Sequence, residues 1–193
     1  MNHLQDPWLQ PWLALVRERA GSAPVLELGC GSGRDTATLV HAGCRVVGID
    51  LSASAIAQAR QAVPHAQFYP MDIQAPFPLG QAGVVVASLS LHYFTWPETE
   101  ALVERIRSIL TPQGLLLCRL NSVNDHHYGA SGHPKIDENY YLVDGEPKRF
   151  FDQEAVDKLF AKGWRVLSIA EHVIDRYTHP KAAWEVVLEK LPE

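Results

Sequence analysis

Two short segments of the chain contain residue types that together could bind a nucleoside. The first is an apolar run that ends in a glycine-rich turn, VLELGCGSGRDT at residues 25–36. The second, VVGID at residues 46–50, is an apolar run that ends on the carboxylate of Asp50. Glycine has no Cβ and adopts positive φ, so such a turn lets a bulky ligand approach the backbone. Because a carboxylate can accept hydrogen bonds from both hydroxyls of a ribose, the two segments predict a nucleoside site.

The spacing of the glycines distinguishes two classes of nucleoside-binding protein. A dinucleotide site follows the pattern G-x-G-x-x-G, whose third glycine would here fall at the position of Arg34. The chain instead has Gly29, Gly31 and Gly33, preceded by Glu27. This version, ELGCGSG, closely resembles the first motif of the class I S-adenosylmethionine-dependent methyltransferases. The resemblance implies S-adenosyl-L-methionine as the cofactor, with Glu27 and the glycine backbone positioning its methionine half.

The same resemblance implies an adenine site beside Asp50. In that family an acidic residue after the third strand, here Asp72, accepts a hydrogen bond from the adenine amino group. Leu51 and Ile73 would then flank the adenine ring as apolar walls, and Ser88, at the end of the next strand, is placed with the cofactor-binding residues. An aspartate at a strand end is also a common helix cap, and the two apolar residues could be ordinary packing, so both interpretations stay open.

The end of the fourth apolar strand is expected to face the reacting methyl group. Methyltransferases that modify exocyclic amines of nucleic-acid bases carry Asn/Asp-Pro-Pro-Tyr/Phe here, whereas this chain has SLSL at residues 88–91. Small-molecule members often end this strand in a loose pattern from leucine to histidine, and Leu89 to His92 is similar to it. The resemblance places His92, Tyr93 and Phe94 at the methyl group of the cofactor, facing the acceptor, and makes His92 and Tyr93 candidate catalytic residues. A lone histidine after a strand is also commonly a capping or core residue.

A polar block after the fifth apolar strand supplies further candidates for the acceptor side. Methyl transfer needs nucleophile, carbon and sulfur in line, and an oxygen or nitrogen nucleophile can also need a base. The adjacent His126 and His127 are the catalytic candidates here. Residues 122–149 are too long for a bare connection, which predicts a substrate-side insertion, although a polar surface loop is the alternative. Adjacent histidines on an irregular loop rarely bind one ion, so we expect no metal site.

Composition limits the class of protein. The length of 193 residues fits one α/β domain. A content of 47% hydrophobic and 20% charged residues is typical of a soluble globular protein. A formal net charge of −5, without a cluster of Lys and Arg, argues against nucleic acid as a partner. No apolar stretch reaches the length of a membrane span, residues 1–10 lack a signal-peptide pattern, and the three cysteines lack C-x-x-C spacing. We therefore expect a cytoplasmic protein with reduced thiols and no membrane partner.

Apolar strand-like runs alternate with helical stretches, which predicts a mostly parallel sheet covered on both faces. The methyltransferase resemblance implies a Rossmann-like, doubly wound α/β sheet of seven strands in the order 3-2-1-4-5-7-6, with an antiparallel C-terminal hairpin. Ser52 is expected to cap a helix and Gly43 to end one. Strands are expected at 25–29, 45–50, 67–72, 83–91, 114–120, 165–174 and 183–189. Helices are expected at 7–20, 34–42, 52–63, 98–110 and 153–162.

These observations favour a single-domain enzyme that transfers a methyl group from S-adenosyl-L-methionine to a small-molecule acceptor by in-line displacement. The acceptor, the methylated atom and the oligomeric state stay open. One alternative is a non-catalytic module that binds S-adenosylmethionine as a sensor or partner subunit. A nicotinamide-dependent oxidoreductase is a second alternative. A tRNA or protein methyltransferase is disfavoured by the acidic balance and by the missing amine-methylation signature, although a protein acceptor stays open.

Overall fold

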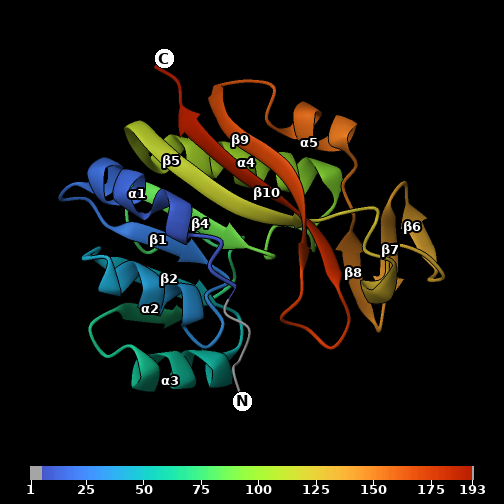
Figure 1. Cartoon of the computed structure of the whole chain (residues 1–193), viewed down its shortest axis with the longest axis horizontal. Coiled ribbons are helices and arrows are strands. Elements are labelled where there is room, and N and C mark those ends of the chain that lie inside the picture. The colour runs from blue at the N-terminus through green and yellow to red at the C-terminus, as the bar shows by residue number, and fades with distance from the viewer. Residues whose placement is uncertain (1–5, 193) are drawn as a thin grey trace.

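The computed structural model describes residues 6–192, so residues 1–5 of the segment inspected for a signal peptide lie outside the described part. Its main feature is a seven-stranded sheet in the order β3-β2-β1-β4-β5-β10-β9 (Figure 1). The first five strands of this order are parallel, whereas β10 is antiparallel to both β5 and β9. Counted within this sheet alone, the order is 3-2-1-4-5-7-6, which confirms the predicted fold class. The strands are β1 (Val25–Leu28), β2 (Val46–Asp50), β3 (Gln67–Pro70), β4 (Ala82–Ser88), β5 (Leu110–Asn121), β9 (Trp164–Ile174) and β10 (Lys181–Lys190).

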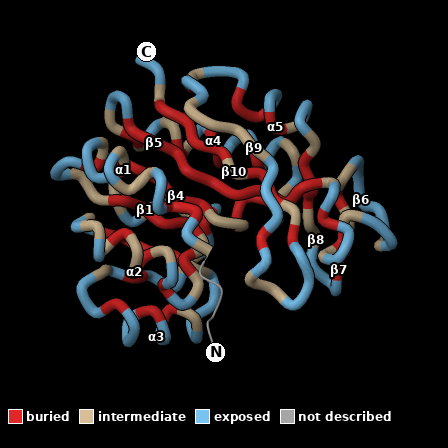
Figure 2. Tube along the Cα trace, in the orientation of Figure 1, coloured by how far each residue is buried: buried red, intermediate tan, exposed pale blue. Residues whose placement is uncertain are grey.

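Helices cover both faces of the sheet because the side chains of β4 alternate between two cores. Val84 and Val86 pack in the core that includes α1 and α2, whereas Val85 and Ala87 pack in the core that includes α4 and α5. Burial on both faces explains why the strand is a continuous apolar run (Figure 2). Among the described residues, no helix is long and apolar enough to cross a membrane. The helices are α1 (Leu13–Ala20), α2 (Arg34–His41), α3 (Ala53–Ala62), α4 (Trp96–Ile109) and α5 (Gln153–Leu159).

Local sequence signals determine where several helices begin and end. Ser52 caps α3, as predicted, since its Oγ accepts a hydrogen bond from a backbone N–H of that helix at 3.2 Å. Gly43, at φ +88°, follows α2 and ends it. The expected N-terminal helix differs, because it starts as a short 3-10 turn, η1 (Gln10–Trp12), before α1. Pro11 lies in that turn and has no N–H to donate, so a regular α-helical ladder cannot run through it.

Residues 122–149 contain regular secondary structure rather than a bare loop. A 3-10 turn, η2 (His126–Tyr128), precedes an antiparallel three-stranded sheet. In Figure 1 this sheet lies beyond the end of β5, beside the main sheet rather than within it. It therefore adds structure where β4 and β5 end. Its strands are β6 (Lys135–Asp137), β7 (Tyr140–Val143) and β8 (Glu146–Arg149).

Candidate functional site

The three glycines in the turn after β1 have three different surroundings. All three have positive φ, a region in which other residues are strained. A Cβ on Gly29 would lie 2.5 Å from Ser90 Cβ, and a Cβ on Gly33 would lie 3.2 Å from Ala59 Cβ. A Cβ on Gly31 would meet no atom within 4 Å. Packing therefore requires glycine at the first and third positions, whereas the middle glycine borders open space that a ligand could occupy.

Asp50 lies beside this turn at the end of β2. Its Oδ2 accepts a hydrogen bond from Gly31 N at 2.8 Å, and its Oδ1 accepts one from Ser52 N at 2.8 Å. The turn and the acid come together because β1 and β2 are parallel and end at the same edge of the sheet. The two bonds orient the carboxylate while each oxygen keeps a further lone pair. A ribose can therefore still be bound by Asp50.

Glu27 supports the turn from within the fold. Its side chain is 3% exposed, and its carboxyl accepts a hydrogen bond from Thr36 Oγ1 at the start of α2. Burial, and next the negative charge of Asp35, raise the pKa of Glu27 well above its ordinary value. The side chain therefore ties the strand before the turn to the helix after it.

A cavity of about 630 Å³ lies at the carboxyl ends of β1, β2 and β4. It is lined by seven residues that the sequence predicted to bind the cofactor or to face the acceptor: Gly29, Asp50, Leu51, Asp72, Ile73, Tyr93 and Phe94. Four other predicted cofactor-binding residues are not among those that line it: Glu27, Gly31, Gly33 and Ser88. The structure therefore gathers the predicted ribose and adenine residues around one cavity.

The residues predicted to contact adenine differ in their hydrogen bonds and in their exposure. Asp72 follows β3 by two residues, and its Oδ1 accepts from Gln74 N at 2.8 Å in a local turn. This bond occupies one lone pair and leaves others for a ligand. Leu51 is 75% exposed beside the cavity, whereas Ile73 is buried. An exposed leucine next to a buried isoleucine gives the cavity apolar surface on that side.

Several lining residues were not assigned to the site from the sequence. Leu89 has φ +58°, which leucine rarely adopts, and its backbone N donates to Arg119 O at 3.0 Å. No residue type in the sequence signals that conformation. Two further lining residues come from β8, which is distant in sequence, so only the tertiary structure brings them here. The unassigned residues are Ser52, Leu89, Ser90, Glu146 and Pro147.

His92, the first catalytic candidate, is buried next to the cavity wall rather than in it. Its side chain is 3% exposed, and its Nδ1 has no hydrogen-bond partner among residues 6–192. Burial, and next the positive charges of Lys181 and Lys148, lower the pKa of His92 to about 3. The imidazole is therefore neutral at physiological pH and a weaker proton acceptor than the sequence suggested.

Three consecutive carbonyl groups after β4 accept hydrogen bonds from the small sheet. His92 O accepts from Arg149 N at 2.7 Å, and Phe94 O accepts from Arg149 Nε at 3.4 Å. Tyr93 O accepts from the Tyr140 hydroxyl at 3.1 Å. Burial raises the pKa of the Tyr93 phenol, so this side chain stays protonated at neutral pH. The small sheet therefore holds the segment that presents two aromatic residues to the cavity.

The other catalytic candidates, His126 and His127, are exposed in η2 and are not among the residues that line the cavity. His127 stacks on His179, with ring centroids 5.0 Å apart. The neighbouring Asp125 is buried and pairs with Lys181 at 2.5 Å. Within the described part of the chain, no group of three or more side chains could hold a metal ion. The structure therefore does not bring these two histidines together with Tyr93.

The sheet order, the glycine turn and the acid at the next strand end define one class of fold. It is shared by an S-adenosylmethionine-dependent methyltransferase from Methanosarcina mazei, with a TM-score of 0.75 and 18% identity, over 89% of this chain and 93% of that one. It is also shared by 1,6-didemethyltoxoflavin-N1-methyltransferase from Burkholderia thailandensis, with a TM-score of 0.71 and 18% identity, over 97% of this chain and 80% of that one. At these identities the likeness establishes the fold.

Sequence comparison finds a similarity for part of the chain. Residues 25–114 match the model of the methyltransferase domain family. The chain is 38% identical over 98 residues to trans-aconitate 2-methyltransferase of Escherichia fergusonii. The aligned residues make up 50% of this chain and 38% of that protein. The corresponding protein of Escherichia coli K12 is 37% identical over the same length. Residues 25–114, which include the glycine turn and Asp50, are therefore similar to a methyltransferase domain, and the chain spans less than half the length of these curated relatives.

Proposed function

We propose that this chain transfers a methyl group from S-adenosyl-L-methionine to a small-molecule acceptor. The observation that carries the proposal is the bond between Gly31 N and Asp50 Oδ2 at the edge of the cavity of about 630 Å³. The free lone pairs of Asp50 would accept from the ribose hydroxyls. The open space over Gly31 would admit the methionine half, because no protein atom fills it. The residues present therefore fit this cofactor.

The other predicted residues divide into contacting and supporting groups in this proposal. Asp72 would accept from the adenine amino group with the lone pairs that its turn leaves free. Leu51 and Ile73 would pack against the ring, since both line the cavity. Three residues outside the lining would act by shaping the turn and the end of β4: Glu27, Gly33 and Ser88.

The acceptor side is proposed to lie along Tyr93 and Phe94. S-adenosylmethionine, when bound, supplies an electrophilic methyl group on a sulfonium sulfur that a nucleophile displaces in line. The faces of the two aromatic rings can stabilise a nearby positive charge. His92 is neutral and buried, so this side favours an acceptor whose nucleophilic atom needs no proton removed. His126 and His127 would contribute only to acceptor entry, because both are exposed and away from the lining.

Calorimetric titration with S-adenosylhomocysteine and with NADH tests the cofactor. We expect binding of the first, and tight binding of NADH alone would favour an oxidoreductase. Formation of S-adenosylhomocysteine across a panel of small-molecule acceptors, compared with Asp50→Ala protein, tests turnover. Binding of the cofactor without turnover on any acceptor would favour a non-catalytic sensor or partner subunit.

A further inference from the structure

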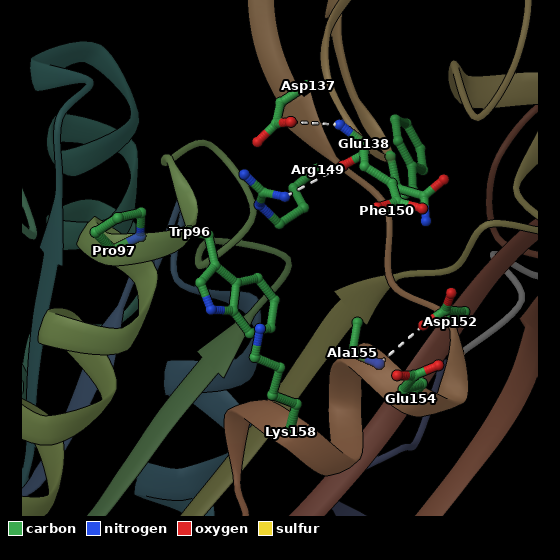
Figure 3. Close-up of a pocket in the computed structure, with 11 residues that line it drawn as sticks. Trp96, Pro97, Asp137, Glu138, Arg149, Phe150, Asp152, Glu154, Ala155 and Lys158 are labelled. Atoms are coloured by element: carbon green, nitrogen blue, oxygen red, sulfur yellow. Dashed lines mark hydrogen bonds between the residues drawn. The ribbon is translucent and has the colours of Figure 1, made fainter.

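A second cavity of about 530 Å³ lies on the other side of the segment that follows β4. Figure 3 shows it between the start of α4, the small sheet and the start of α5. Trp96 and Phe150 give it aromatic walls, and Arg149 and Lys158 are its cationic residues. None of these four side chains lines the first cavity.

Arg149 differs from the other buried cations of residues 6–192. Arg119 pairs with Asp6 and Glu185, and Lys181 pairs with Asp125. Arg149 is only 5% exposed, yet no carboxylate lies within 4.0 Å of it in the described part of the chain. The exposed Asp137 interacts with Arg149 through space but does not form an ion pair with it. A buried charge without a directly paired counter-ion is destabilising, which calls for an explanation.

The hydrogen bonds of the Arg149 guanidinium are also incomplete. Its Nε and Nη1 donate to backbone carbonyls at 3.4 Å, at the long limit for such bonds, and its Nη2 has no partner among the described residues. The ring of Tyr140 lies 4.5 Å from the guanidinium carbon, and that of Trp96 lies 5.6 Å away. The rings hold the group in position but accept no conventional hydrogen bond from Nη2. The Nη2 of Arg149 therefore remains free to donate a hydrogen bond to an anionic acceptor.

We propose that this second cavity binds a small molecule through a carboxylate group held by Arg149. A planar guanidinium matches a carboxylate in a two-bond geometry. Lys158 lies 4.9 Å from the Trp96 ring and adds a second, exposed cation. Of the four carboxylates that line the cavity, Asp137, Glu138 and Glu154 are exposed and screened by water, and Asp152 caps α5. The one buried guanidinium therefore fits one carboxylate group of a ligand.

The cavity is linked to the proposed methyl-transfer site through the same arginine. The Arg149 backbone and Nε bond to the carbonyls of His92 and Phe94, and Phe94 lines the first cavity. The carboxylate could therefore belong to the methyl acceptor or to a separate ligand. The acceptor case rests on the proposed function, whereas the carboxylate site itself does not.

Calorimetric titration of the whole chain with succinate, at low salt, tests the site, with succinamide as the uncharged probe. We expect saturable succinate binding and at least roughly tenfold weaker binding of succinamide, because hydrogen bonds between charged groups are lost. Arg149→Gln should also lose about tenfold in succinate affinity. The matched control is Arg45→Gln, which removes an exposed arginine near the start of β2 and should keep wild-type affinity.

If circular dichroism shows that Arg149→Gln does not fold, Ala155→Leu provides a second test. Ala155 lines the cavity from α5, so a larger side chain fills the space while Arg149 stays in place. We expect this variant to lose succinate binding. The proposal is overturned if the wild type shows no saturable succinate binding, if a folded Arg149→Gln or Ala155→Leu protein binds it as well as the wild type, or if inorganic phosphate binds more tightly than succinate.

Mass spectrometry after incubation with S-adenosylmethionine and succinate identifies the source of the carboxylate. If succinate is an acceptor, a carboxylate oxygen bonds to the methyl carbon, the carbon–sulfur bond breaks and S-adenosylhomocysteine leaves, with no proton to remove. A methyl ester then forms. Binding without an ester identifies a separate ligand. If succinate binds but S-adenosylhomocysteine does not, the proposed function fails and the carboxylate site stands.

Discussion

The backbone N–H of Gly31 donates a 2.8 Å hydrogen bond to the Oδ2 of Asp50. This bond joins the glycine turn after β1 to the acidic end of β2, so the orientation of the carboxylate depends on the conformation of the turn. The same glycine leaves open space above it. One residue therefore supplies both the support for the acid and the room for a ligand.

Asp50→Ala should weaken S-adenosylhomocysteine binding by at least roughly tenfold, since hydrogen bonds to a charged group contribute about 1.5–3 kcal/mol. Calorimetric titration measures the change. Asp157→Ala is the matched control, because Asp157 is an exposed aspartate on α5 outside the cavity. Unchanged affinity in folded Asp50→Ala protein would show that Asp50 does not bind the ribose.

Alanine substitutions at two glycines of the turn should have different effects. Gly29→Ala places a Cβ 2.5 Å from Ser90 Cβ, so the free energy of unfolding should fall by about 2–4 kcal/mol. Gly31→Ala meets no atom within 4 Å, so backbone strain alone should cost about 1 kcal/mol while cofactor affinity falls. Urea unfolding and calorimetry measure the two quantities. Equal losses of stability in both variants would contradict this division of roles.

Thr36→Val should destabilise the fold by about 1–3 kcal/mol, because it leaves the buried Glu27 carboxyl without its hydroxyl donor. Urea unfolding at neutral pH measures the loss. Thr38→Val is the control on the same helix, since it makes the same change at a half-buried position away from Glu27. Comparable losses in the two variants would mean that the Glu27 bond adds nothing specific.

His92 should make stability depend on pH. Its pKa in the folded state, about 3, lies below the ordinary value of 6.5, so the unfolded chain binds the extra proton first as pH falls. The stability from the neutral imidazole is complete above about pH 6.5 and is lost as pH falls toward about 3.

His92→Phe should remove this contribution. The free energy of unfolding of each protein is compared at about pH 7.5 and about pH 5. Its fall between the two pH values should be about 2 kcal/mol smaller in the variant than in the wild type. Urea unfolding of both proteins at the two pH values measures it, and the other titrating groups are common to both. Parallel losses in the two proteins would show that His92 titrates normally.

Much of the fold could be predicted because its signals are local. The continuous apolar run of β4 reflects burial on both faces, and Ser52 and Gly43 mark helix ends through their own backbone and side-chain chemistry. The N-terminal helix was predicted too long because apolar periodicity does not register the missing N–H of Pro11. The second cavity could not be predicted, since it depends on how α4, α5 and the small sheet meet.

The sequence by itself determined the glycine turn, the acid at the next strand end and the strand order that the family resemblance implies. The turn and the acid follow from spacing within short segments, where φ preferences and side-chain period act locally, whereas the strand order came from the resemblance alone. Only the tertiary structure decided that His92 is buried and neutral, that the η2 histidines lie away from the first cavity, and that Arg149 Nη2 has no hydrogen-bond partner within residues 6–192. Burial and charge pairing depend on residues far apart in the chain, and no short segment contains that information.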